Sequence, residues 1–150
     1  MKKLSLLGST GSIGTQALQV VQNLREQGEK WEVAALAARS SVNRLEEQAR
    51  KFHPEVVAVF DEGAALSLRQ SLRDTDIQVL SGMEGLCEAA AWPEADLTLN
   101  AVVGMVGLQP TLAALQAGKA LALANKETLV AGGAIVMEAA RKRNLPILPV

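Results

Sequence analysis

The sequence is poor in the residues that build disulfides and metal clusters. Its one cysteine, Cys87, excludes an intrachain disulfide, and its one histidine, His53, belongs to no group of residues with metal-ligand spacing. The formal net charge of −1 offers no general attraction to nucleic acid, so any preference for anions has to arise locally. No apolar run approaches the roughly 20 residues that span a bilayer. We therefore expect a cytoplasmic protein that binds small molecules and has neither nucleic-acid nor membrane partners.

What the sequence does contain is ample apolar material for one domain. Its 150 residues are 49% hydrophobic and 21% charged, which is ordinary for a globular protein. A chain of this length buries about two-thirds of its unfolded surface, so a substantial core is expected.

Short apolar runs alternate with segments in which apolar residues recur every three or four positions. The first pattern predicts strands and the second predicts helices. Strands that alternate with helices form right-handed crossovers in a mostly parallel sheet. We therefore predict a Rossmann-like, doubly wound α/β fold with about seven strands flanked by helices. The predicted strands cover residues 3–7, 31–37, 56–60, 77–80, 97–103, 120–123 and 146–150.

Three glycines follow the first predicted strand directly: Gly8, Gly11 and Gly14. Their spacing differs by one position from the G-x-G-x-x-G fingerprint of dinucleotide-binding folds, but the motif stands between the first strand and the first helix, as the fingerprint must. Glycine permits a tight turn and a close approach of ligand to backbone, and the following helix directs free N–H groups toward an anion. The motif predicts a site for dinucleotide phosphates; the alternative is a purely structural turn.

The segment after the second predicted strand, Arg39-Ser40-Ser41, indicates which dinucleotide is bound. Folds that prefer NAD usually place a carboxylate here to hold the ribose 2′-hydroxyl. A guanidinium and two hydroxyls favour a 2′-phosphate instead, which predicts NADPH. The alternative is that Arg39 is a solvated loop residue and that Ser40 or Ser41 only caps the next helix.

A third signal follows the sixth predicted strand, where Asn125, Lys126 and Glu127 begin a helical pattern. Asn125 suits the N-cap position, and a lysine in the first turn is unfavourable beside the positive end of the helix dipole. Ligands of open α/β sheets bind at this edge, so Lys126 is a candidate for holding an anionic or carbonyl-bearing substrate, with Asn125 and Glu127 positioning the cofactor. The alternative is an exposed lysine without a function.

Three segments of the chain match one known family together: the glycine loop at residues 7–14, the Val-Val-Gly-Met-Val-Gly-Leu-Gln-Pro-Thr-Leu segment at residues 102–112, and the Leu-Ala-Asn-Lys-Glu-Thr-Leu-Val segment at residues 123–130. They resemble the 1-deoxy-D-xylulose 5-phosphate reductoisomerase family. The glycine loop alone is shared by many reductases, whereas the combination is specific, and the resemblance extends over essentially the whole chain.

The resemblance implies an enzyme of non-mevalonate isoprenoid biosynthesis. Such an enzyme isomerises 1-deoxy-D-xylulose 5-phosphate and reduces the product with NADPH to 2-C-methyl-D-erythritol 4-phosphate. The resemblance also implies Mg²⁺ or Mn²⁺ as a Lewis acid on the substrate oxygens, and a homodimer for the full-length protein.

Carried over by position, the resemblance implies cofactor contacts from all three segments. These residues are Thr10, Gly11, Ser12, Ile13, Gly104, Asn125 and Glu127, with Lys126 as a substrate contact. Many family members carry Gly-Lys-Asn or Gly-Ser-Asn where this chain has Arg39-Ser40-Ser41. The chain therefore departs from the family at the expected 2′-phosphate contacts, with Arg39 in a position to replace the charge of the lysine.

The last predicted strand, at residues 146–150, stops without a closing loop or helix, and the family pattern continues from there with Asp-Ser-Glu-His. We therefore expect residues 1–150 to be the NADP-binding domain of a longer protein, with the catalytic residues, the metal ligands and the C-terminal domain beyond residue 150. Alone, this domain is expected to bind NADPH without turnover. Two rival interpretations stay open: another NADP-dependent reductase with a similar loop, and a stand-alone nucleotide-sensing module.

Overall fold

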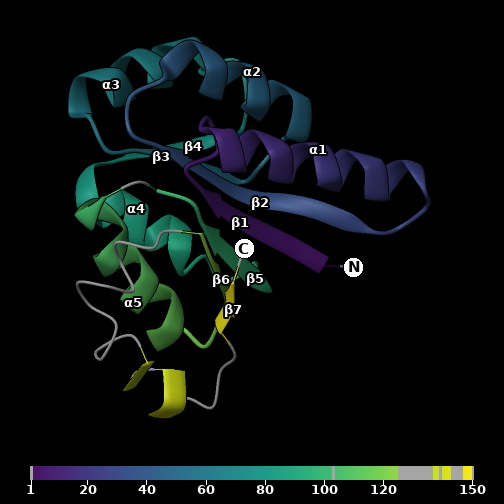
Figure 1. Cartoon of the computed structure of the whole chain (residues 1–150). Coiled ribbons are helices and arrows are strands. Elements are labelled where there is room, and N and C mark those ends of the chain that lie inside the picture. Colours follow the sequence, from purple (N-terminus) through teal and green to yellow (C-terminus); the bar gives the residue numbers. More distant parts are fainter. Residues whose placement is uncertain (1, 103, 125–136, 139, 143–146, 150) are drawn as a thin grey trace.

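In a computed structural model, which describes residues 2–102, 104–124, 137–138, 140–142 and 147–149, seven strands form one sheet. All neighbouring strands are parallel, in the order β4-β3-β2-β1-β5-β6-β7 (Figure 1). This confirms the doubly wound, Rossmann-like prediction. The strands are β1 (Lys2–Leu7), β2 (Trp31–Ala38), β3 (Val56–Val59), β4 (Gln78–Ser81), β5 (Leu97–Asn100), β6 (Ala120–Leu123) and β7 (Ile147–Pro149).

Helices cover both faces of this sheet. Figure 1 shows α1, α2 and α3 on one face, and α4 and α5 on the other. None of the helices in the described part of the chain has the length and apolar character of a membrane span. The described helices are α1 (Ser12–Glu26), α2 (Val42–Phe52), α3 (Glu62–Ser71), α4 (Gly82–Ala90) and α5 (Leu108–Gln116), with a short 3₁₀ helix, η1 (Met105–Gly107), before α5.

The central strand β1 shows why the sequences of the strands are continuous apolar runs. Its neighbouring residues Leu6 and Leu7 are both fully buried, but they belong to different core clusters. Leu6 packs in the cluster that includes Leu45 of α2, and Leu7 packs in the cluster that includes Leu86 of α4. A strand covered on both faces needs apolar side chains at successive positions, which is typical of parallel sheets.

The strand order reverses at β1, and this reversal positions the site. β1 pairs with β2 on one side and with β5 on the other, so that Leu7 lies beside both Ala37 and Asn100. The chain leaves the carboxyl ends of β1 and β5 toward opposite faces of the sheet. In open α/β folds, ligands bind in the crevice at such a switch point.

The predicted strand over residues 97–103 ends earlier, at Asn100. The Asn100 side chain explains this difference, because its Oδ1 accepts a hydrogen bond from the backbone N–H of Val102 at 3.1 Å and turns the chain out of the sheet. Gly104 then takes a positive φ of 87°, which continues the turn. Propensity alone does not indicate this early end, since Val102 favours a strand.

Two hydroxyls from the sheet hold the end of α4. Ser5 Oγ of β1 donates to the carbonyl of Ala89, and Thr98 Oγ1 of β5 donates to the carbonyl of Ala90 at 2.7 Å. The last carbonyls of a helix have no partner within the helix, so a buried helix end needs such donors. This accounts for the buried hydroxyl residues Ser5 and Thr98 in the sheet.

Arg50 of α2 links that helix to the end of α3. Its guanidinium donates to both carboxylate oxygens of Asp74, at 3.0 and 3.1 Å, to the carbonyl of Ser71 at 2.8 Å, and through Nε to Glu46 at 3.0 Å. The hydrogen bonds from Arg50 are the largest of the causes that hold the pKa of Asp74 below its ordinary value. A carboxylate with a lowered pKa stabilises the fold above its unfolded pKa, and this contribution is lost as the pH falls through the folded pKa.

We therefore expect Asp74→Asn to lower the melting temperature slightly at neutral pH, because the pair is exposed and exposed pairs contribute little. The difference from the parent chain should shrink as the pH falls below about 4 and through the lowered pKa of Asp74, because the parent chain then loses the carboxylate charge as well. Thermal unfolding at several pH values measures this. Asp76→Asn, which removes an equal charge nearby, is the matched control; an equal loss in both variants at neutral pH would contradict a specific role for the Arg50 pair.

Candidate functional site

The glycine loop leaves the carboxyl end of β1 in a tight turn. Gly8 has a positive φ of 80°, and the N–H groups of Gly8 and Ser9 both donate to the carbonyl of Ala37, at 2.8 and 3.0 Å. The N–H of Gly11 then donates to the carbonyl of Gly8 at 3.2 Å, and α1 begins at the next residue. The strand, turn and helix of the predicted dinucleotide motif are therefore present in the expected order.

The three glycines of this loop do not serve the same purpose. A Cβ on Gly8 would lie 2.6 Å from the carbonyl oxygen of Ala101, and a Cβ on Gly14 would lie 2.1 Å from the carbonyl oxygen of Gly8. Both positions exclude a side chain because of the protein's own packing. A Cβ on Gly11 would meet only the Gly8 carbonyl oxygen, at an ordinary 3.6 Å, and Gly11 has an unstrained φ of −80° and is exposed. The fold does not require this glycine, which fits a position where a ligand comes close to the backbone.

The first turn of α1 is open to an anion. Gly11 is its N-cap and has no side chain to cap the helix, and the turn holds no acidic residue. The geometry of an α-helix leaves the N–H groups of Ser12, Ile13 and Gly14 without acceptors inside the helix. A dinucleotide phosphate fits these donors and the positive end of the helix dipole. Of the predicted contacts, Thr10, Gly11, Ser12 and Ile13 therefore lie together at this helix start.

Arg39, Ser40 and Ser41 form the exposed link between β2 and α2. Ser41 occupies the N-cap position of α2, but its side chain makes no capping hydrogen bond. The part of the alternative in which the Ser41 side chain caps α2 therefore does not hold, whereas Arg39 is exposed, as that alternative expects. The link follows the strand that pairs with β1, so it lies at the same edge of the sheet as the glycine loop.

Helix α2 is attached to the glycine loop by two side chains that the sequence analysis missed. Gln48 Nε2 donates to the carbonyl of Ser9 at 2.8 Å, and Arg44 Nη1 donates to the carbonyl of Thr10 at 3.0 Å. Gln48 is buried, whereas Arg44 is exposed. A signal for Arg44 was present in the sequence, because a cation in the first turn of a predicted helix is disfavoured by the helix dipole.

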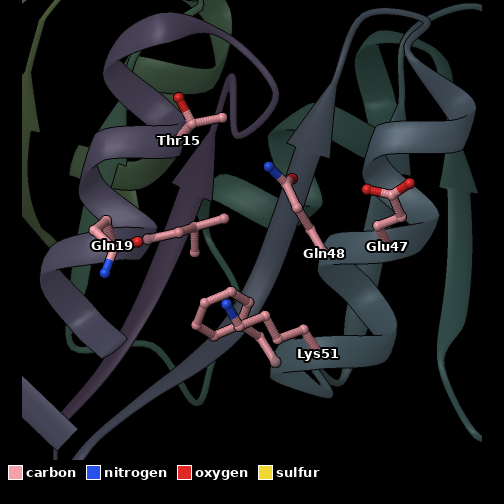
Figure 2. A pocket seen from close by; sticks show the side chains of 7 residues that line it. Thr15, Gln19, Glu47, Gln48 and Lys51 are labelled. Atoms are coloured by element: carbon pink, nitrogen blue, oxygen red, sulfur yellow. The ribbon is translucent and has the colours of Figure 1, made fainter. Parts of the chain in front are cut away.

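A small hollow of about 190 Å³ lies between α1 and α2, beside these contacts. Figure 2 shows Thr15 and Gln19 of α1 on one side and Glu47, Gln48 and Lys51 of α2 on the other. The hollow is smaller than the roughly 300–1,000 Å³ of ordinary ligand pockets. Two of these residues also contact the glycine loop: Gln48 Nε2 donates to the carbonyl of Ser9, and Thr15 Oγ1 donates to the carbonyl of Gly11 at 2.9 Å.

The loop after β5 forms the other wall of the switch point. The buried Asn100 Nδ2 donates to the carbonyl of Gly107 at 2.9 Å and to Thr111 Oγ1 at 2.7 Å, which fixes the turn that carries Gly104. This loop lies close to the glycine turn, because a Cβ added to Gly8 would lie only 2.6 Å from the carbonyl oxygen of Ala101. Gly104 therefore lies on the loop beside the glycine turn, where the resemblance implies a cofactor contact.

The predicted contacts Asn125, Lys126 and Glu127 lie outside the described residues, so their placement stays a prediction. Among the residues that the structure does describe, no group of three or more His, Cys, Asp or Glu side chains is arranged to hold a metal ion.

The comparison with protein families decides the assignment. The model of the 1-deoxy-D-xylulose 5-phosphate reductoisomerase family matches residues 4–133 of the chain. The chain belongs to this family. Reductoisomerases from two bacteria are among its relatives: that of Desulfitobacterium hafniense strain DSM 10664 / DCB-2 is 51% identical over 150 residues, and that of Halothermothrix orenii is 55% identical over 135 residues.

Solved reductoisomerase structures share the fold. One of them, described as DOX-P reductoisomerase in complex with NADPH, fosmidomycin and magnesium, is 38% identical with a TM-score of 0.91, and the match covers 99% of this chain and 36% of that one. The chain likewise spans 39% of the D. hafniense protein and 34% of the H. orenii protein. It thus corresponds to little more than a third of these reductoisomerases.

Proposed function

We propose that this chain is the NADPH-binding domain of a 1-deoxy-D-xylulose 5-phosphate reductoisomerase. The full-length protein would isomerise 1-deoxy-D-xylulose 5-phosphate and reduce it to 2-C-methyl-D-erythritol 4-phosphate, as the resemblance of the sequence to this family implies. The observation that carries the proposal is the start of α1 at the switch point, where the exposed Gly11 has no structural need to be glycine. Because the chain belongs to this family, we take NADPH to be the ligand that binds this exposed backbone.

The residues of the chain have distinct roles in this proposal. The N–H groups of Ser12 and Ile13 bind the dinucleotide phosphate, and the hydroxyls of Thr10 and Ser12 supply further donors. Arg39, Ser40 and Ser41 hold the 2′-phosphate from the end of β2. Gly104 keeps the loop after β5 free of a side chain beside the nicotinamide. When bound, NADPH supplies the hydride for the reduction.

The remaining roles fall on residues outside the described part of the chain or outside the chain itself. Asn125 and Glu127 complete the cofactor site, and Lys126 binds the substrate. A divalent cation, Mg²⁺ or Mn²⁺, would be held by residues of the full-length protein beyond this domain and would act as a Lewis acid. We also propose a cytoplasmic location, on the composition of the sequence, and a homodimer of the full-length protein, as the resemblance implies.

The chain is expected to bind NADPH at least about tenfold more tightly than NADH, a difference of about 1.4 kcal/mol. The reason is that charge-assisted hydrogen bonds to the 2′-phosphate form only with NADPH. Titration calorimetry or the fluorescence of the reduced nicotinamide measures both dissociation constants. Equal affinities for the two dinucleotides would contradict the preference that we assign to residues 39–41.

The same preparation tests whether this domain binds NADPH without carrying out the reaction. We expect no oxidation of NADPH when 1-deoxy-D-xylulose 5-phosphate and Mg²⁺ or Mn²⁺ are added, because in this proposal the metal ligands lie beyond this domain. Full-length protein under the same conditions is the positive control. Metal-dependent turnover by the 150-residue chain would show that its own residues complete the active site.

A further inference from the structure

Arg44 stands where a helix disfavours a positive charge. It is the third residue of α2, whose first turn contains no acidic residue. Beside the positive end of the helix dipole, a cation is destabilising by a few tenths of a kcal/mol unless it has another partner. No carboxylate forms an ion pair with Arg44 within the described ranges. Interactions within α2 therefore do not explain why an arginine occupies this position.

The guanidinium of Arg44 reaches the glycine loop. Nη1 donates to the carbonyl of Thr10 at 3.0 Å, across 34 residues of sequence. A guanidinium carries five N–H donors in a fixed fork, and this contact uses one of them. Arg44 is exposed, so its other donors face solvent at the point where α2 meets the loop.

The surroundings of Arg44 are the two elements that the proposed function assigns to NADPH. Thr10 belongs to the phosphate-binding turn, and Ser41, whose hydroxyl does not cap α2, stands three residues before Arg44. In dinucleotide-binding folds, the 2′ position of the adenosine ribose lies at the end of the second strand, beside the glycine loop. Arg44 joins these two elements.

Arg44 could simply hold the loop in place, but another residue is better suited to that structural role. The buried Gln48, one turn further along α2, already binds the neighbouring carbonyl of Ser9 at 2.8 Å. A neutral side chain is sufficient for such a contact, whereas the full charge of Arg44 is not used by any described acceptor other than the Thr10 carbonyl. The hydrogen bond to Thr10 instead holds the guanidinium in place before a ligand arrives.

We propose that Arg44 binds the 2′-phosphate of NADPH and is a specificity residue for this cofactor over NADH; this inference rests on the proposed function. A phosphomonoester carries close to two negative charges at neutral pH and accepts two parallel hydrogen bonds from a guanidinium. Arg39 supplies the second cation, from the other end of the link between β2 and α2. Because Thr10 already orients Arg44, less side-chain entropy is lost on binding.

The test is the ratio of NADPH to NADH affinity in Arg44→Met and Arg44→Lys. Methionine keeps an unbranched apolar side chain without donors, and lysine keeps the charge without the fork. We expect Arg44→Met to weaken NADPH at least about tenfold and NADH less than about twofold, with Arg44→Lys in between. Arg25→Met, which removes an equal charge at the far end of α1, should change neither affinity.

The outcomes separate this inference from the proposed function. Equal weakening of NADPH and NADH in Arg44→Met would show that Arg44 only positions the loop, and unchanged NADPH affinity would exclude any contact; either result overturns the inference and leaves the proposed function intact. If the unmodified chain binds neither dinucleotide, the proposed function itself fails. Thermal unfolding of each variant establishes that it is folded. If Arg44→Met does not fold, the NADPH and NADH affinities of Arg44→Lys test the inference on their own.

Discussion

Replacing Gly14 with alanine should destabilise the chain by about 3 kcal/mol and disrupt the glycine loop. The new Cβ would lie 2.1 Å from the carbonyl oxygen of Gly8 and 2.7 Å from the Cα of Ser9. Both are backbone atoms, so no side chain can rotate away, and the loop or the start of α1 has to move. Alanine has the higher helix propensity by about 1 kcal/mol, which offsets only part of this cost.

Gly11→Ala is the matched control for this prediction. Its Cβ would meet only the Gly8 carbonyl oxygen, at 3.6 Å, so we expect a loss of at most about 1 kcal/mol, from the poorer N-cap. Its affinity for NADPH should nevertheless fall, because the methyl group stands where the phosphate approaches. Urea denaturation and NADPH titration of both variants separate the two effects. Equal stabilities of the two variants would contradict the packing role of Gly14.

Replacing Asn100 with alanine should have the next largest effect, a loss of about 2–3 kcal/mol. Asn100 is fully buried and takes part in three hydrogen bonds, to Gly107, Thr111 and Val102. A buried hydrogen bond contributes about 1 kcal/mol, and the deleted side chain also leaves a cavity. Since these bonds fix the loop that carries Gly104, NADPH affinity should fall as well.

A double-mutant cycle tests whether Asn100 and Thr111 act as one network. Thr111 Oγ1 accepts from Asn100 Nδ2 and itself donates to the carbonyl of Gly107 at 2.8 Å. The losses in Asn100→Ala and Thr111→Val should therefore be non-additive by at least about 0.5 kcal/mol. Additive losses in urea denaturation would mean that the two side chains stabilise the loop independently.

The fold could be predicted from the sequence because its determinants are local. Buried parallel strands need apolar residues at successive positions, and crossover helices need them every three or four, so both patterns are visible along the chain. The end of β5 could not be predicted in this way. The side chain of Asn100 decides it, and an asparagine gives no sign in the sequence of whether it faces solvent or turns the backbone beside it.

The site was predictable only in part, for a similar reason. The spacing of the glycines identified the loop, but it could not reveal that Gly8 and Gly14 serve packing while Gly11 does not, because this depends on contacts in three dimensions. The contacts of Arg44 and Gln48 span 34 and 39 residues of sequence and were missed. The Asn125–Glu127 prediction lies outside the described residues and stays a prediction.

The strand order also has a consequence for how the chain folds. The strands β1, β2, β3 and β4 are neighbours in the sheet in the same order as in the sequence, so short crossovers connect each pair. By contrast, β1 and β5 are joined by contacts between distant residues, such as Lys3 and Asp96, which are 93 residues apart. Closing so long a loop costs more chain entropy, and distant contacts slow folding. We therefore expect β1–β4 to assemble first, with the β1–β5 seam among the later steps. The crevice proposed to hold the cofactor lies on that seam, so a bound dinucleotide would stabilise a contact that forms late and would act mainly by slowing unfolding.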